Sequence, residues 1–171
     1  MAQRDEDINF RVVLYQPEIP ANTGNIGRLC LGMNAALHLI RPVRFLLTDK
    51  YLKRAGLDYW DELNVHMHSS LTEFRESYPE SRIWLCSTKA VMPYHKVKFQ
   101  RGDALIFGPE SRGLPEELLR EYSENTLSIP MTKQIRSFNL ANSVGIILSE
   151  GMRQLEFPGC TVGSGKIFVD G

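Results

Sequence analysis

The chain has 171 residues, of which 43% are hydrophobic and 23% charged, and its 20 basic and 20 acidic residues balance. This length and composition are typical of one globular domain and exclude collagen-like and disordered chains. The apolar stretches are far shorter than the roughly 20 residues of a membrane-spanning helix, and the polar start Met1–Asp7 is not a secretory signal.

Strand-like and helix-like segments alternate along the chain. Runs rich in β-branched and aromatic residues predict strands over 10–15, 37–40, 65–68, 82–87, 104–107 and 127–129. Helical periodicity and helix-start signals predict helices over 22–36, 46–55, 71–78, 115–122 and 140–154. The alternation predicts an α/β fold, with a mainly parallel sheet flanked by helices. We expect a flexible leader over 1–8, one domain over 9–159 and a tail over 160–171.

The cysteines and histidines do not predict a metal centre. The cysteines Cys30, Cys86 and Cys160 are far apart and odd in number, which favours free, mostly buried thiols in a reducing cytoplasm. His66 and His68 would share one face of a strand, but no third ligand lies nearby in the sequence. We therefore expect surface histidines, no metal and a cytoplasmic protein.

The charges are unevenly distributed. A net charge of zero counts against a nucleic-acid partner, because such domains usually carry an excess of Lys and Arg. Basic residues nevertheless form two clusters, Arg41, Arg44, Lys50, Lys53 and Arg54, and Lys89, His95, Lys96, Lys98 and Arg101. Each cluster fits either a solvated face or a contact with a nucleic-acid backbone.

Three polar loops follow predicted strands, where open α/β sheets bind their ligands. The first, residues 17–28, delivers the chain through two prolines to a helix that Asn22 or Thr23 can cap. The start of that helix suits an anion, and Arg28 lies between one and two turns along, where it could bind a phosphate through two hydrogen bonds. The alternative is a capped helix with a surface arginine.

The second loop, residues 105–115, leaves a buried strand and enters a helix. Gly108 would allow a ligand to approach the backbone closely, and Gly113 permits a positive φ. Loop geometry explains the glycines and prolines, but it does not explain Glu110 and Arg112. This pattern favours a functional loop.

The third loop, residues 129–143, precedes the last helix. Ser137 or Asn139 can cap that helix. Asn142 and Ser143 add polar groups to a helix that soon becomes apolar, and polar groups on an element that faces the core need partners.

Together, residues 22–28, 107–114 and 129–141 resemble the three motifs of the SpoU branch of the SPOUT methyltransferases, in the same order and spacing. The resemblance runs from Phe10 to Gly159. The chain is most similar to the short tRNA (cytidine-34-2′-O)-methyltransferases. Three further strings support this subgroup: Val13–Pro20, Arg54–Tyr59, and Arg153–Gln154 before Pro158–Gly159.

The resemblance implies a parallel sheet with a deep trefoil knot at its C-terminal end. It implies a homodimer with the active site at the interface, contacts through the last helix and the helix after Asn22, and S-adenosylmethionine as cofactor without a metal. By the family pattern the cofactor contacts, largely through main-chain atoms, would come from Cys86, Ser87, Thr88, Gly108, Pro109, Ile129, Met131, Ser137 and Leu140.

The resemblance also implies methyl transfer to the ribose 2′-oxygen of the wobble nucleotide of tRNA, C34 or a modified U34. The family pattern places Arg28 at the centre of catalysis, with Asn22, Glu110, Ser137 and Asn139 around it. A guanidinium stays protonated in proteins, so a phosphate anchor or stabilisation of the developing alkoxide fits Arg28 better than the role of base. The proton acceptor is left open.

The residues also fit other functions. The same chemistry on ribosomal RNA or at another tRNA position fits the motifs equally well, and a knotted RNA-binding protein without catalysis is a further alternative. An unrelated nucleotide-binding α/β domain would need three ordered motifs by chance. One residue departs from the pattern, because Ser149 stands where relatives often have Tyr, which bears on nucleotide recognition.

Overall fold

The computed structural model describes residues 7–45 and 59–163. The helix expected over 46–55, and with it Lys50, Lys53 and Arg54, lies outside the described residues. Ile8, which the sequence assigns to the leader, is only 2% exposed, and its carbonyl accepts a hydrogen bond from Arg101 Nε at 3.2 Å.

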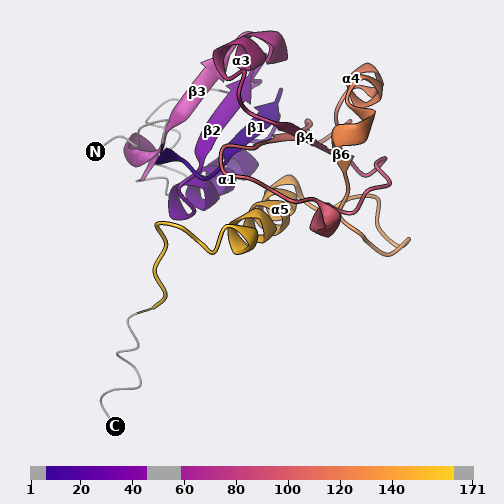
Figure 1. Cartoon of the computed structure of the whole chain (residues 1–171). Helices are drawn as coiled ribbons and strands as arrows, with labels where there is room; N and C mark the ends of the chain where they lie inside the picture. Colours follow the sequence, from indigo (N-terminus) through magenta and orange to yellow (C-terminus); the bar gives the residue numbers. More distant parts are fainter. Residues whose placement is uncertain (1–6, 46–58, 164–171) are drawn as a thin grey trace.

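The described strands form one parallel sheet of six, in the order β3-β2-β1-β5-β4-β6 (Figure 1). Their bounds are β1 Arg11–Tyr15, β2 Ala36–Ile40, β3 Val65–His68, β4 Ile83–Cys86, β5 Ala104–Phe107 and β6 Thr126–Leu127. The predicted parallel α/β sheet is confirmed. The bounds of the first five strands agree with the prediction to within one residue at each end. The last strand, predicted over 127–129, ends earlier, at Leu127, and Ser128 forms an isolated bridge with Pro93 instead.

The described α-helices are α1 Pro20–Gly32, α3 Leu71–Ser77, α4 Glu116–Glu121 and α5 Leu140–Gln154, with short 3₁₀ turns η2 Trp60–Glu62, η3 Tyr94–Lys96 and η4 Ser123–Asn125. The last helix has its predicted bounds. The first begins two residues early, because Pro20 starts it after the N-cap Ile19, and the expected cap at Asn22 or Thr23 is wrong. It ends at Gly32, since Ala36 already belongs to β2.

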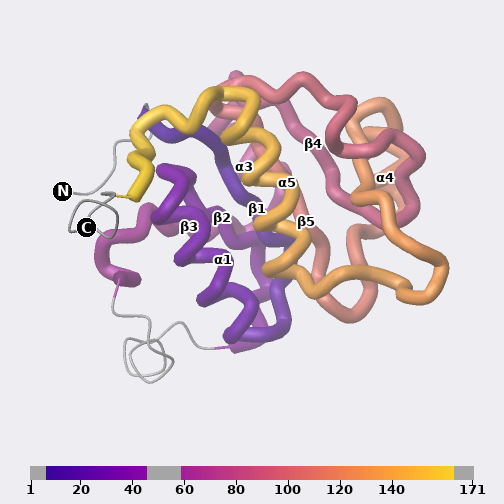
Figure 2. Tube along the Cα trace, turned by 90° about the horizontal axis from the view of Figure 1, so that it is seen from below, coloured from indigo at the N-terminus to yellow at the C-terminus, as the bar shows by residue number. Residues whose placement is uncertain are grey.

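The helices form two layers around the sheet. Helices α1 and α5 cover one face and α3 and α4 the other (Figures 1 and 2). Alternate residues of β1 serve the two layers: Val12 and Leu14 pack with Ile26 of α1 and the α5 side chains, whereas Val13 packs with Phe74 of α3. Both faces of the central strands are therefore buried, as parallel sheets require.

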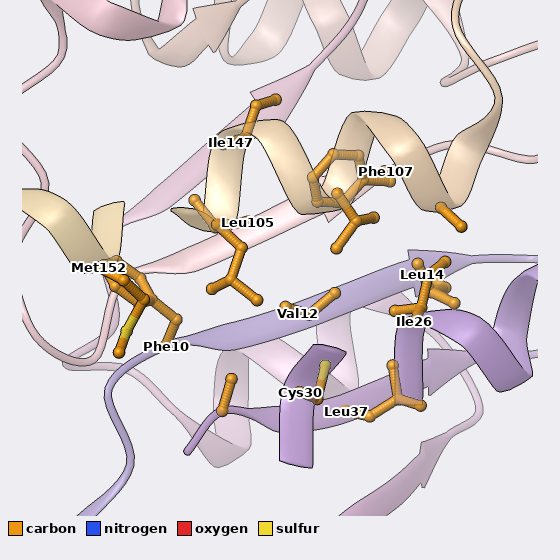
Figure 3. Close-up of a cluster of buried hydrophobic side chains, with 14 of the residues drawn as sticks. Phe10, Val12, Leu14, Ile26, Cys30, Leu37, Leu105, Phe107, Ile147 and Met152 are labelled. Carbon is orange, nitrogen blue, oxygen red and sulfur yellow. The ribbon is translucent and has the colours of Figure 1, made fainter. Parts of the chain in front are cut away.

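The core beneath α1 and α5 is the larger of the two. Figure 3 shows Phe10, Val12 and Leu105 packed between α1 and α5. Ile147 and Met152 of α5 belong to the same cluster. Gly151 allows this close packing, because a Cβ there would lie 2.6 Å from the Phe10 ring. None of the helices within residues 7–45 and 59–163 has the length and apolar character needed to cross a membrane.

Three histidines come together on the α3 side of the sheet. Parallel pairing sets His38 of β2 beside β3, so that its Nδ1 lies 3.0 Å from His68 Nε2 and its ring stacks on His66 at 4.7 Å. His38 is fully buried and His68 is 6% exposed, so the expectation of surface histidines is wrong for His68. Among the described residues no group of three or more His, Cys, Asp or Glu is arranged to hold a metal ion.

This cluster predicts loss of stability in mild acid. Burial first, then the charges of His66, His68 and Arg11, lower the pKa of His38 from 6.5 to about 2. The folded protein therefore keeps His38 neutral while the unfolded chain protonates it, so stability is lost as the pH falls below about 6.5. Between pH 6.5 and 5.5, His38 should remove about 1 kcal/mol from the free energy of unfolding.

Urea unfolding of the protein and of His38→Gln at both pH values measures this effect. The remaining titrating groups contribute to both proteins, so the variant should lose less stability over the interval. Equal losses in the two proteins would refute the assignment.

Candidate functional site

The loops that follow β4, β5 and β6 meet the start of α1 around a cavity of about 480 Å³. This volume is within the range of small-molecule sites. The cavity lies at the carboxyl ends of the strands, where the topology of an open α/β sheet places ligands. All nine residues predicted to bind the cofactor line it: Cys86, Ser87, Thr88, Gly108, Pro109, Ile129, Met131, Ser137 and Leu140.

Four of the five predicted catalytic residues also line this cavity: Asn22, Glu110, Ser137 and Asn139. The fifth, Arg28, does not. Its side chain is exposed on α1, with the guanidinium 5.0 Å from the centre of the Tyr59 ring. Tyr59 in turn donates a hydrogen bond from its hydroxyl to the Gly24 carbonyl at 2.8 Å, which ties the ring to α1.

Glu110 replaces the missing local cap of α1. Its carboxylate accepts hydrogen bonds from the N–H groups of Glu18 (2.8 Å) and Ile19 (3.1 Å), just before the helix begins. No side chain of α1 or of Ile19 caps the helix itself. A carboxylate of the chain itself therefore lies at the N-terminal end of α1, where the helix dipole favours negative charge.

A chain of hydrogen bonds links three of the cavity residues. Asn22 Nδ2 donates to Glu110 Oε1 at 3.2 Å, and Asn139 Nδ2 donates to Asn22 Oδ1 at 3.0 Å. The Asn139 Oδ1 accepts from the N–H groups of Ala141 and Asn142, which confirms Asn139 as the N-cap of α5. The side-chain nitrogen and oxygen atoms of all three residues therefore have hydrogen-bond partners within the chain.

The cavity wall is apolar and neutral where β4 ends. Removal from water raises the pKa of the Cys86 thiol well above its usual value. Cys86 is therefore a protonated thiol at neutral pH, unsuited to nucleophilic attack. Phe107, Leu127 and Ile147 add apolar surface.

Gly108 has a packing role that the sequence did not predict. A Cβ at this position would lie 2.3 Å from Leu114 N and 2.4 Å from the carbonyl carbon of Gly113. The close neighbour is thus the turn of its own loop, although Gly108 also lines the cavity. Gly113 has the predicted positive φ, +70°.

Three basic residues at the cavity are absent from the predicted catalytic and cofactor-binding residues: Lys89, Arg112 and Arg136. Arg112 and Arg136 lie within the second and third loops, so their place in those loops was an available signal. Lys89 follows the end of β4, where its ammonium pairs with Glu116 at 2.5 Å. Together they give the cavity a cationic border, which suits an anionic substrate.

The SpoU rRNA Methylase family matches residues 9–149.

Curated relatives cover most of the chain. A protein of Saccharophagus degradans named tRNA (cytidine(34)-2′-O)-methyltransferase is 46% identical over 151 residues, which is 88% of this chain and 98% of that protein. A protein of Aeromonas hydrophila with the same name is 48% identical over 149 residues, which is 86% of this chain and 96% of that protein.

Solved structures agree with this fold. One, described as "Structural insights into the 2-OH methylation of C/U34 on tRNA", is 47% identical with a TM-score of 0.81 and covers 86% of this chain and 96% of that one. The SpoU methyltransferase AviRb of Streptomyces viridochromogenes in complex with AdoMet is 23% identical, with a TM-score of 0.74. The match covers 87% of this chain and 59% of that one, and the similarity is one of fold alone.

Proposed function

The chain belongs to the SpoU rRNA Methylase family, and we propose that it methylates the ribose 2′-oxygen of nucleotide 34 of tRNA, with S-adenosylmethionine as the methyl donor. The observation that carries the proposal is the single cavity that gathers all nine expected cofactor residues with Asn22, Glu110 and Asn139. Relatives of 46% and 48% identity, named for this reaction at cytidine 34, support the choice of substrate.

The residues present fit the cofactor. The cavity has the volume of a small-molecule site, apolar walls for a base, and loop backbone at Gly108, Ile129 and Met131 for main-chain contacts. We infer that these three, with Cys86 and Leu140, hold S-adenosylmethionine. When bound, it supplies a methyl group that its sulfonium already activates for transfer.

The task of the protein is then to orient the acceptor and exclude water. Glu110 fixes Asn22, and Asn22 fixes Asn139, so the polar wall is held rigid before the substrate arrives. Ser137 is exposed at the cavity and is free to contact the ribose. Arg28 supplies positive charge for a phosphate or for the developing alkoxide.

We infer that the loops around the cavity belong to a trefoil knot, as the resemblance implies. The supporting contacts join distant segments. Tyr94 N–H donates to the Ser128 carbonyl and Ser128 N–H to the Met92 carbonyl, each at 2.8 Å. The chain then passes to Asn139, which reaches Asn22.

We further propose a homodimer with α1 and α5 at the interface. The position of Arg28 on the exposed side of α1, outside the cavity of its own chain, supports an active site that two subunits complete. Sedimentation equilibrium should give about twice the chain mass of 19.5 kDa. A single-chain mass at micromolar concentration would contradict the dimer.

The cationic border of the cavity is the proposed entry for RNA. Lys89, Arg112 and Arg136 would contact the phosphates of the anticodon loop, and the ribose 2′-hydroxyl distinguishes RNA from DNA. Because tRNA is the substrate, we place the protein in the cytoplasm.

The test is transfer of tritium from labelled S-adenosylmethionine to total tRNA, followed by nucleoside analysis. Label should appear in 2′-O-methylcytidine or in derivatives of 2′-O-methyluridine. Label in ribosomal RNA with none in tRNA would show that the substrate is ribosomal RNA, for which the family is named. Cofactor binding with no transfer to either RNA would indicate a non-catalytic protein.

A further inference from the structure

The loop after β1 and the loop after β5 are joined by hydrogen bonds to two glutamates, one in each loop. The Glu18 carboxylate accepts from the N–H (3.0 Å) and the hydroxyl (2.9 Å) of Ser111. The Glu110 carboxylate accepts from the N–H groups of Glu18 and Ile19. Each loop thus holds the other through a carboxylate, and we call Glu18, Glu110 and Ser111 the inter-loop clamp.

The clamp is continuous with the polar wall of the cavity. Glu110 accepts from Asn22, and Asn22 accepts from Asn139, which caps α5. A chain of hydrogen bonds therefore runs from the outer rim at Glu18 to the start of the last helix. It connects three segments of the chain: Glu18 and Glu110 are about 90 residues apart in the sequence, and Glu110 and Asn139 are about 30 residues apart.

The negative charge of Glu18 strengthens the hydrogen bonds between Ser111 and Glu18. The hydrogen bonds from Ser111 lower the pKa of the Glu18 carboxyl, so Glu18 is ionised at neutral pH. Hydrogen bonds to an ionised acceptor are stronger than those between neutral groups. The turn of the second loop is already closed by Gly113 N–H and the Pro109 carbonyl at 2.9 Å. The bonds from Ser111 to Glu18 consequently serve to dock one loop on the other.

Resting on the proposed function, we propose that Glu18 is a positioning residue for methyl transfer. By holding Ser111 it keeps Glu110 against the start of α1, and Glu110 sets Asn22 and Asn139 at the cavity. Glu18 does not itself line the cavity, so it acts through these neighbours. Its loss should misalign the acceptor ribose and leave the cofactor contacts of the other loops in place.

The kinetic test compares Glu18→Ala with Glu18→Gln and with Glu117→Ala, a control that removes an exposed carboxylate on α4. Glu18→Ala should lower kcat by about 10- to 100-fold, because small misplacements of reacting groups have effects of this size. The KM for tRNA and the Kd for S-adenosylmethionine should change by no more than about threefold. Glu18→Gln keeps an acceptor oxygen and should recover part of kcat.

A double-mutant cycle identifies the partner. If Glu18 acts through Ser111, then Glu18→Ala/Ser111→Ala should be no slower than Glu18→Ala alone. Additive losses would overturn the proposal. So would an unchanged kcat in Glu18→Ala, or a fall in cofactor affinity as large as the fall in kcat, since the residue would then support the fold only.

NMR spectroscopy tests the role of the clamp independently of methyl transfer. The side-chain amide NMR signals of Asn22 and Asn139 should move in Glu18→Ala and stay in place in Glu117→Ala. If the unaltered protein methylates no tRNA, the proposed function fails and these signals still decide the structural link. Signals that do not move would overturn the proposal even in an active enzyme.

Discussion

Replacing Arg28 by alanine is expected to lower kcat for tRNA methylation by about 100- to 1,000-fold, the range for loss of one preorganised electrostatic group. Cofactor affinity should be preserved, because Arg28 does not line the cavity. Arg28→Lys keeps the charge but not the planar donor pair, so it should recover only part of the activity. Kinetics with saturating S-adenosylmethionine provide kcat, and a separate binding titration provides the Kd for S-adenosylmethionine.

The matched control is Arg120→Ala, which removes an exposed arginine from α4. Its kcat should equal that of the unaltered protein. If Arg28→Ala retains full kcat, the arginine is a surface residue held on Tyr59 and has no part in the reaction. If it loses cofactor affinity as well, its effect comes from damage to α1.

Replacing Gly108 by alanine is expected to damage both the fold and the cavity. The new Cβ would lie 2.3 Å from Leu114 N and 2.4 Å from the Gly113 carbonyl carbon, and neither backbone atom can turn away. Overpacking of this kind destabilises by about 1–3 kcal/mol. The loop must also shift from the cavity that it lines, so cofactor affinity should fall by at least about tenfold, or 1.4 kcal/mol.

Gly32→Ala provides the comparison for Gly108→Ala. Its Cβ would meet no atom within 4 Å beyond its chain neighbours and the backbone of its own helix, and Gly32 ends α1, so the variant should be as stable as the unaltered protein or up to about 1 kcal/mol more stable. Urea unfolding and calorimetric titration with S-adenosylmethionine test both variants. Unchanged cofactor affinity in Gly108→Ala would show that the loop tolerates the shift.

Local patterns were enough to predict most of the sheet and the last helix. The strands β1, β2 and β5 are buried on both faces and mostly apolar, and such runs are distinctive in sequence. The last helix was predicted to the residue because its cap is local: Asn139 binds the N–H groups of the first turn.

The start of the first helix could not be predicted because its cap is not local. Glu110 lies 91 residues beyond Ile19 in the sequence, and no nearby side chain signals the helix start. Likewise, the histidine cluster depends on the pairing register of β2 with β3, which sets His38 beside His66 and His68. Separation along the chain concealed both contacts.

The members of the site were predictable, but their arrangement was not. The three motifs, recognised by resemblance, contain six of the nine expected cofactor residues, and the other three, Cys86, Ser87 and Thr88, lie at the end of β4. The fold brings all nine together at one cavity. The sequence does not contain the direction of each side chain. It therefore could not show that Glu110 and Asn139 bind one another through Asn22, or that Arg28 lies outside the cavity.

The most direct test of the central claim uses one tRNA made in two forms, with either a ribose or a 2′-deoxyribose at nucleotide 34. Both forms offer the same bases and almost the same backbone, and only the first has the acceptor oxygen. We expect label from S-adenosylmethionine to enter the ribose form and to be absent from the deoxy form. Equal labelling of the two would place the methyl group elsewhere and contradict the proposed reaction.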